Sequence, residues 1–177
     1  MKIGTLVDSS AFTAMYDKFF KKYSVKYFGA DFDWRWFRAQ AIAESGIDPA
    51  AVSWCGAMGI MQIMPATFAE IQKTLPWILS VEDPEQNIEA GIFYDRRLYR
   101  MWSNPRPELD RLALMFASYN AGAGNILKAQ KLCTVEPNLW SSIAAVAKHV
   151  PGWKSSETLG YVTKIMTLMS KQKRQTP

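Results

Sequence analysis

The chain has 177 residues, a size that suits one domain. It is 49% hydrophobic and 21% charged, which excludes a disordered chain, and its longest apolar runs are too short for a membrane-spanning helix. The net charge of +5 favours an anionic partner, namely nucleic acid, an anionic membrane or an anionic cell-wall polymer.

The first half of the chain predicts helices separated by one structured loop. Asp8, Ser9 and Ser10 can cap a first helix that carries apolar residues from Phe12 to Phe20 at helical spacing. Asp33 can cap a second helix over 34–44, which the Gly46 and Asp48-Pro49 turn signals end. Residues 50–64 are rich in Gly, Ala and Ser and predict a loop. Pro65 and Pro84 then each open a further helix.

The second half also predicts helices, over 108–120, 122–131, 138–149 and 156–171. No stretch shows the sustained alternation of a half-buried strand, so we expect no large sheet. There is no repeat and no low-complexity linker. We therefore predict one compact all-α domain over residues 1–177.

The helix over 34–44 carries the most informative residue. Trp34, Phe37, Ala41 and Glu44 follow one another at steps of three, four and three, so they share one helical face. Glu44 thus ends an apolar stripe beside a loop. Desolvation raises the pKa of such a carboxyl group, and a carboxylic acid that keeps its proton can act as a general acid. The alternative is a solvated carboxylate at an exposed helix end.

The loop after this helix suggests a polar ligand. Small residues, Gly56 and Gly59 among them, let the backbone come close to another group. Gln62 follows among apolar neighbours, and its amide would suit a sugar hydroxyl or acetamido group. Met and Ile clusters of this kind are also typical of a plain core.

Four ordered segments together resemble the soluble lytic transglycosylase family, over roughly residues 30–170. They are Ala43-Glu44-Ser45-Gly46 with the loop Gly56-Ala57-Met58-Gly59-Ile60-Met61-Gln62-Ile63-Met64-Pro65, then Asn87-Ile88-Glu89-Ala90-Gly91, then Ser118-Tyr119-Asn120-Ala121-Gly122, and finally Glu157-Thr158-Leu159-Gly160-Tyr161-Val162. The resemblance implies a lysozyme-like helical domain of the goose-lysozyme type with a glycan-binding cleft. It implies a peptidoglycan lytic transglycosylase, a lyase that cuts between N-acetylmuramic acid and N-acetylglucosamine and leaves a 1,6-anhydromuramic acid end.

The residues allow this chemistry with one carboxyl group. Ordinary glycosidases use two carboxylates, whereas a single acid suffices if the substrate supplies the nucleophile. Glu44 would protonate the glycosidic oxygen and then, as a carboxylate, accept the proton of the C6 hydroxyl. Asp48, Asp83 and Glu89 are the candidates for a second carboxylate in a hydrolytic lysozyme, which is the nearest alternative. For Asp48 a capping role in the Asp-Pro turn is favoured.

The resemblance also implies substrate-binding roles for seven further residues. Ser45 would support the acetamido region or the acid, or would cap the helix end. Gln62 would bind the glycan, and Met61 would pack near the sugar or in the core. Tyr119 would hold the Glu44 carboxyl group. The others have competing structural roles: a turn-forming Asn120, a Glu157 favoured by a helix N-terminus, and a Tyr161 that lines the groove or fills the core.

The remaining predictions concern partners and location. We expect a monomer that needs no cofactor or metal and binds peptidoglycan glycan strands, with no nucleic acid and no membrane insertion. A catalytically inactive wall-binding module is a further alternative. His149 is the sole histidine, and Cys55 and Cys133 can form one disulfide or stay reduced. The apolar stretch from Ile3 to Val7 is short for an export signal. We therefore expect a bacteriophage-delivered or lysis-released enzyme, or a trimmed mature domain, acting in the periplasm or at the wall.

Overall fold

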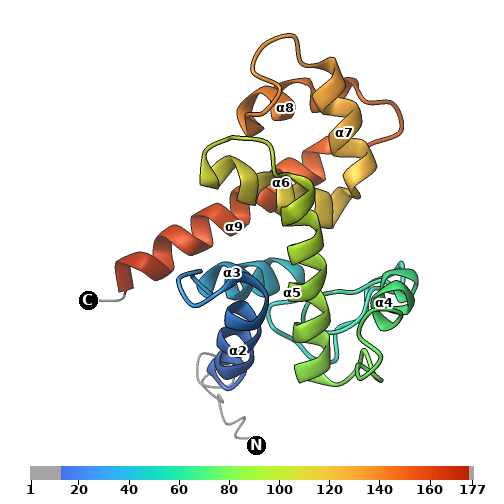
Figure 1. Cartoon of the computed structure of the whole chain (residues 1–177). Coiled ribbons are helices and arrows are strands. Elements are labelled where there is room, and N and C mark those ends of the chain that lie inside the picture. Colours follow the sequence, from blue (N-terminus) through green and yellow to red (C-terminus); the bar gives the residue numbers. More distant parts are fainter. Residues whose placement is uncertain (1–12, 176–177) are drawn as a thin grey trace, which may run out of the picture. The chain divides into compact units, whose positions relative to one another are not determined.

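The computed structural model describes residues 13–175, with side chains through residue 171. These residues form helices joined by loops (Figure 1). The helices are α2 (Asp17–Phe28), α3 (Arg35–Glu44), α4 (Pro65–Gln72), α5 (Pro84–Met101), α6 (Glu108–Ala121), α7 (Ala123–Leu132), α8 (Trp140–Val146), the 3₁₀ turn η1 (Ala147–His149) and α9 (Ser155–Gln175). The described residues contain two isolated β-bridges in place of a sheet. The all-α prediction is therefore confirmed.

Apart from the first predicted helix, the predicted helix boundaries agree with the structure to within a few residues. Pro65 and Pro84 each open a helix as predicted. The segment predicted over 138–149 ends as the tighter turn η1 rather than as one continuous helix. The first predicted helix, with apolar residues from Phe12 to Phe20, begins too early, because a turn at residues 15–16 precedes α2 at Asp17–Phe28. Its proposed caps at 8–10 lie outside the described residues.

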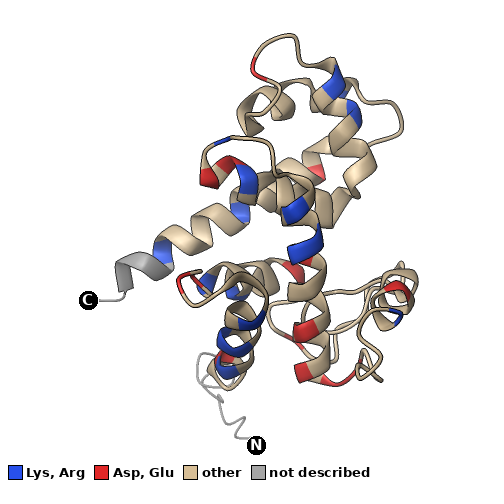
Figure 2. Cartoon of the chain, viewed as in Figure 1, with Lys and Arg blue, Asp and Glu red and all other residues tan. Residues whose placement is uncertain are grey.

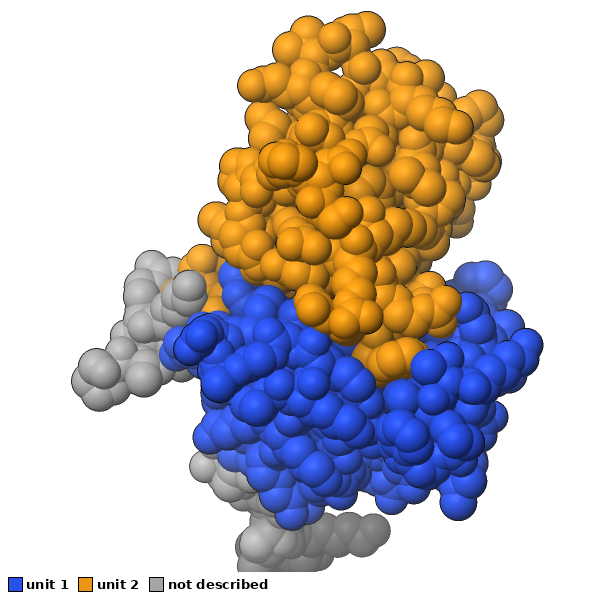
Figure 3. Space-filling model, in the orientation of Figure 1, with its two compact units in different colours: residues 1–92 blue, residues 93–177 orange. Residues whose placement is uncertain are grey.

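The chain divides into two compact units, Met1–Ile92 and Phe93–Pro177 (Figure 3). The boundary falls within α5. The prediction of one domain over residues 1–177 stays a prediction.

In the first unit, a repeated polar contact joins α2 to the start of α5. Glu85 accepts hydrogen bonds from Lys22 and Tyr23 at 2.7 and 2.8 Å. One turn further on, Glu89 accepts them from Lys26 and Tyr27 at 2.6 and 2.8 Å. Residues four apart share a helix face, so two Lys-Tyr pairs on α2 match two glutamates on α5. This contact uses one face of α5 and leaves the opposite face for the loop.

Exposed lysines lie along α2 (Figure 2). Lys18, Lys21, Lys22 and Lys26 are all exposed. The ammonium groups of Lys18 and Lys21 lie over the rings of Phe19 and Trp34, 4.7 and 4.8 Å from the ring centroids. Part of the positive charge of the chain therefore lies on this helix.

The second unit is a helix cluster with an apolar centre. Helix α6 packs against α7, α8 and α9. Its residues from Leu112 to Ser118 are all buried, while Ile126, Ile143 and Ile165 are fully buried on the helices around it. Such continuous burial makes α6 the core helix of this unit. Within residues 13–175, no helix is both long and apolar enough to cross a membrane.

Candidate active site

Glu44 is the last residue of α3. Asp33 lies just before this helix, and its carboxylate accepts a hydrogen bond from the backbone N–H of Arg35, the first residue of the helix, at 3.1 Å. Phe37 and Ala41 on the predicted apolar face are fully buried, and Glu44 at its end is partly buried. The carboxyl group therefore sits where the apolar stripe meets the loop.

Ser45 ties this helix end to the loop. Its hydroxyl donates a hydrogen bond to the carbonyl of Ile60 at 2.8 Å and accepts one from the backbone N–H of Asp48 at 3.1 Å. Two left-handed residues, Gly46 and Ile47, complete the turn, with φ of 71° and 63°. Of the two predicted roles for Ser45, these contacts favour the structural one, which fixes the backbone that carries Glu44.

The loop 50–64 is folded back on itself by two bridges, Val52 with Met58 and Met58 with Ile63. Gln62 adopts a left-handed conformation, with φ of 48°. Its amide nitrogen donates to the carbonyls of Ala51 and Gly59 at 3.2 and 3.0 Å. Both amide hydrogens are thus used inside the loop. The amide oxygen remains as an acceptor, and the predicted contact of Gln62 with a glycan stays a prediction.

Asn87 is a site-forming residue to which the sequence analysis gave no role. Its amide nitrogen donates to the carbonyls of Met58 and Val81 at 3.0 and 2.9 Å, and its oxygen accepts from the backbone N–H of Met61 at 2.8 Å. One buried side chain therefore satisfies three backbone groups. Gly59 packs so closely on Asn87 that a Cβ atom there would overlap the amide.

Met61 belongs to the core. Its side chain has no exposed surface, and it packs against Gly91 of α5, where a Cβ atom would lie 2.8 Å from it. This burial favours core packing over contact with a sugar. Asn87 and Gly91 are four residues apart and face the loop together, on the side of α5 opposite Glu85 and Glu89.

The second unit contains the other predicted site residues. Tyr119 of α6 lies edge-on to Tyr94, with ring centroids 5.5 Å apart. The Asn120 side chain accepts a hydrogen bond from the Thr158 hydroxyl at 2.8 Å. We expected Asn120 to bond its own turn, and the structure shows instead that it joins two motif segments. Gly122, with φ of 77°, makes the turn that follows.

Glu157 and Tyr161 differ in environment. Glu157 is exposed in the first turn of α9, and its carboxylate lies 3.9 Å from Lys154. Tyr161 is buried one turn later, at 9% exposure. These positions favour the structural alternatives, a helix N-terminal carboxylate and a core side chain. The expectation that Tyr119 holds Glu44 joins residues of the two units and stays a prediction.

The three candidates for a second catalytic carboxylate all have structural partners. Asp48 accepts a hydrogen bond from the backbone N–H of Ala50 at 2.9 Å, which is the predicted turn role. Asp83 caps α5 through the N–H of Gln86 at 2.8 Å.

Glu89 is 4% exposed, and besides Lys26 and Tyr27 it accepts a hydrogen bond from the Trp77 indole at 3.3 Å. Burial would raise the pKa of Glu89, but the hydrogen bonds and the charge of Lys26 outweigh it and hold this pKa below its ordinary value. Glu89 is therefore an ionised structural anchor of α5.

The two cysteines are free thiols. Cys55 is exposed on the loop, and its hydrogen bond with the Ser53 hydroxyl at 3.1 Å lowers the pKa of the thiol. Burial raises the pKa of the Cys133 thiol. Among the side chains that the structure describes, no three His, Cys, Asp or Glu residues are grouped as metal ligands would be.

The fold and these motifs correspond to one protein family. The model of the transglycosylase SLT domain matches residues 24–135, more than half of the chain. The chain therefore belongs to this family.

Among curated relatives, the membrane-bound lytic murein transglycosylase F of Desulfosudis oleivorans is 31% identical over 150 residues, which cover 77% of this chain and 32% of the relative.

Solved structures of lytic transglycosylases resemble the chain too. The 70-kDa soluble lytic transglycosylase of Escherichia coli matches with a TM-score of 0.65 and 29% identity, over 86% of this chain and 23% of that enzyme. A complex of the 70-kDa soluble lytic transglycosylase with bulgecin A matches over the same shares, with the same TM-score and 26% identity. The lytic transglycosylase Slt of Pseudomonas aeruginosa, an inactive mutant, matches with a TM-score of 0.73 over 98% of this chain and 27% of that one. At 21% identity this last match concerns the fold alone. The chain spans about a third or less of the length of these proteins.

Proposed function

We propose that this chain is a peptidoglycan lytic transglycosylase that cleaves the bond between N-acetylmuramic acid and N-acetylglucosamine without water. The observation that carries the proposal is the position of Glu44, a partly buried acid at the end of the buried apolar face of α3. Glu44 stands at a helix end that Ser45 fixes against the loop. The alternative acids Asp48, Asp83 and Glu89 are each bound to structural partners. A mechanism with one acid fits this arrangement.

In the proposed reaction, the Glu44 carboxylic acid gives its proton to the glycosidic oxygen of the leaving sugar as the bond to C1 breaks. The substrate's own 2-acetamido group stabilises the positive charge at C1. The Glu44 carboxylate then accepts the proton of the C6 hydroxyl, and that oxygen forms the new bond to C1. Glu44 ends protonated as it began, so one residue serves as acid and as base.

The surrounding residues would orient the glycan. The free amide oxygen of Gln62 would accept a hydrogen bond from a sugar hydroxyl or acetamide N–H, while Ser45 would hold the acid in place. We place the enzyme at the cell wall as a monomer that needs no metal, so activity should survive dialysis against a chelator. Lys18 and Lys21 on α2 would favour approach to an anionic wall.

Mass spectrometry of the muropeptides released from purified sacculi tests this function. The transglycosylase reaction leaves 1,6-anhydromuramic ends, which are lighter by one water than the reducing ends that a hydrolase leaves. Anhydro products are expected to dominate. Reducing muramic acid ends would assign the hydrolytic lysozyme reaction, and release of no product would leave a wall-binding module.

A further inference from the structure

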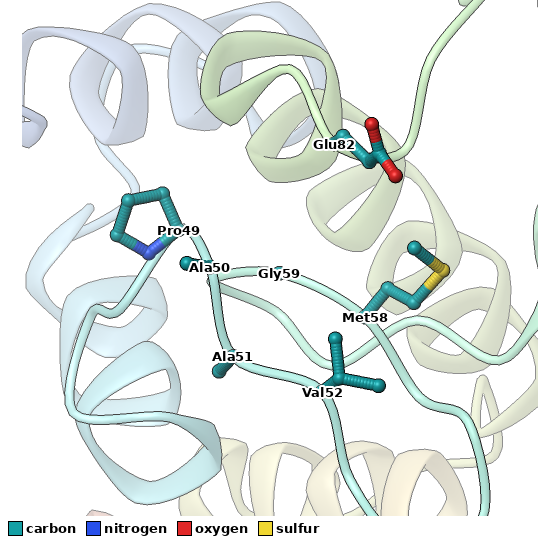
Figure 4. Close-up of a pocket in the computed structure, with 7 residues that line it drawn as sticks. All are labelled: Pro49, Ala50, Ala51, Val52, Met58, Gly59 and Glu82. Atoms are coloured by element: carbon teal, nitrogen blue, oxygen red, sulfur yellow. The ribbon is translucent and has the colours of Figure 1, made fainter.

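Two features outside the predicted catalytic and glycan-binding residues differ in charge. In the first unit, a pocket of about 440 Å³ lies against the loop that follows Glu44 (Figure 4). Its lining is small and apolar, and the one charged side chain, Glu82, is exposed. In the second unit, arginines gather where α5 ends and α6 begins (Figure 2). The pocket specifies no ligand, whereas several arginines close together favour an anion.

The arginine cluster consists of Arg96 and Arg100 of α5, Arg106 of the connecting loop and Arg111 of α6. The guanidinium groups of Arg96 and Arg111 both lie over the ring of Tyr99, 5.6 and 3.6 Å from the ring centroid. Burial and the charges of Arg100 and Arg111 lower the pKa of Arg96. Burial and the charge of Arg111 likewise lower the pKa of Arg106. The four side chains therefore form one cluster in which neighbouring positive charges repel each other.

The two carboxylates next to the cluster have other partners. The Tyr99 hydroxyl donates to both carboxylate oxygens of Glu108, at 2.8 and 2.9 Å. Asp110 accepts a hydrogen bond from the backbone N–H of Trp140 at 2.6 Å. Its charge favours the charged form of Arg106 but does not outweigh burial and repulsion. In the part of the chain whose side chains are described, neither carboxylate forms an ion pair with an arginine.

Three of the arginines keep donors for a ligand. Arg100 is exposed and makes no hydrogen bond or ion pair with any residue that the structure describes. Arg111 donates its Nε–H to the carbonyl of Tyr99 at 3.0 Å, and Arg106 donates to two backbone carbonyls at 3.1 and 3.2 Å. A guanidinium group has five N–H donors. Each of the three therefore has N–H groups that no described residue accepts.

We infer that the arginine cluster is a binding site for a ligand that carries neighbouring phosphate groups. Phosphate oxygens accept paired hydrogen bonds from a guanidinium group, and their charge would relieve the repulsion between the arginines. Because the cluster spans the end of α5, a loop and the start of α6, it matches several phosphates rather than one. It offers no aromatic face for a nucleic-acid base, since the Tyr99 ring lies under Arg111 and Trp102 is 2% exposed. The ligand is thus a phosphate-bearing polymer or lipid surface without bases.

Calorimetry with inorganic tripolyphosphate tests the site. The wild-type chain should bind it, and Arg100→Gln and Arg111→Gln should each bind about tenfold more weakly, the effect of losing one hydrogen bond between charged groups. Arg100→Lys keeps the charge but not the planar fork, so its affinity should lie between those of Arg100→Gln and the wild type. Lys128→Gln removes an exposed charge of α7 and should bind like the wild type.

Three results of this experiment would overturn the inference. They are no binding by the wild-type chain, equally tight binding of citrate, which carries its charge on carboxylates, and wild-type affinity in Arg100→Gln. Arg100→Gln decides the test if Arg111→Gln lowers stability, because the Arg100 side chain has no hydrogen bond to lose among the described residues.

Two probes that carry the same glycerol phosphate group identify the source of the ligand. Poly(glycerol phosphate) presents this group on a soluble chain, and phosphatidylglycerol vesicles present it on a membrane surface. Binding that Arg100→Gln weakens supports the inference and assigns whichever source is bound. Binding of neither probe, or binding that Arg100→Gln leaves unchanged, would contradict it. Tighter binding of a single-stranded oligonucleotide than of poly(glycerol phosphate) would assign nucleic acid instead. None of these measurements uses turnover, so they decide the inference whether or not the chain cleaves glycan.

Discussion

The two units of the chain are stabilised in different ways. In the first unit, polar side chains hold an irregular loop by bonding to its backbone, as Ser45, Gln62 and Asn87 do. In the second, α6 is buried by the helices around it, and the helices satisfy their own backbones. A loop has backbone groups without helical partners, so it depends on particular side chains. The unit that carries Glu44 is therefore the one more sensitive to single polar substitutions.

Asn87→Ala should show this sensitivity most strongly. It removes the partners of three backbone groups, and each buried group left without one costs ~1–3 kcal/mol. We expect the free energy of unfolding of the first unit to fall by about 3–5 kcal/mol. Asn120→Ala, which removes one bond from an exposed residue of the second unit, should cost about 1 kcal/mol. Urea unfolding of both variants measures the difference, and equal losses would remove the contrast between the units.

Gly59→Ala should be the next most damaging. Gly59 has φ of 75°, and a Cβ atom there would overlap Asn87. The left-handed conformation alone costs ~1–2 kcal/mol for a residue with a side chain, so a total of about 2–4 kcal/mol is expected. The matched change in the second unit, Gly160→Ala in the open interior of α9, should instead stabilise by ~0.5–1 kcal/mol. Thermal unfolding compares the two, and a neutral Gly59→Ala would contradict the close packing described.

Glu89 makes the first unit sensitive to acid. Because its pKa in the folded chain lies below the ordinary value of 4.5, its ionised form stabilises the fold above that value. This contribution is lost as the pH falls through the folded pKa. Glu89→Gln should therefore be less stable than the wild type at neutral pH, with the gap closing below about pH 4.5. Unfolding free energies measured from pH 7 to pH 3 test this, and a gap that stays constant would show that Glu89 ionisation does not contribute.

The smallest effect is expected at the loop tip. Trp54 is 99% exposed, so Trp54→Ala should change the free energy of unfolding by less than about 0.5 kcal/mol. Trp102 of the second unit is 2% exposed and donates its indole N–H to Ser118 at 2.9 Å. Trp102→Ala should cost ~3–5 kcal/mol. Similar losses of unfolding free energy in the two variants would mean that the Trp54 side chain packs against other residues in solution.

Sequence reasoning succeeded where structure is set locally. Asp33, Pro65 and Pro84 mark helix starts within a residue or two, because capping and proline geometry act over one turn. The apolar face ending at Glu44 followed from helical spacing alone. The turn role of Asp48 was likewise a local signal.

Sequence reasoning failed where contacts join distant segments. The three bonds of Asn87 reach backbone groups at Met58, Met61 and Val81, and no local pattern specifies them. Met61 is a core residue for the same reason, since only the fold brings it against Gly91. The contact between α2 and α5 did leave a signal, two Lys-Tyr pairs four residues apart on one helix and two glutamates four apart on the other.

The central claim is that Glu44 alone serves as acid and base, and turnover by Glu44→Gln tests it most directly. The change keeps the shape of the side chain but removes the proton that it must give and take. General acid–base catalysis is worth ~10²–10⁴-fold, and because one group serves both steps, we expect a loss at or beyond the upper end with unfolding free energy close to wild type. Glu136→Gln, the same change on an exposed loop, should keep the wild-type rate. A Glu44→Gln variant that keeps a tenth of the activity on sacculi would contradict the single-acid mechanism.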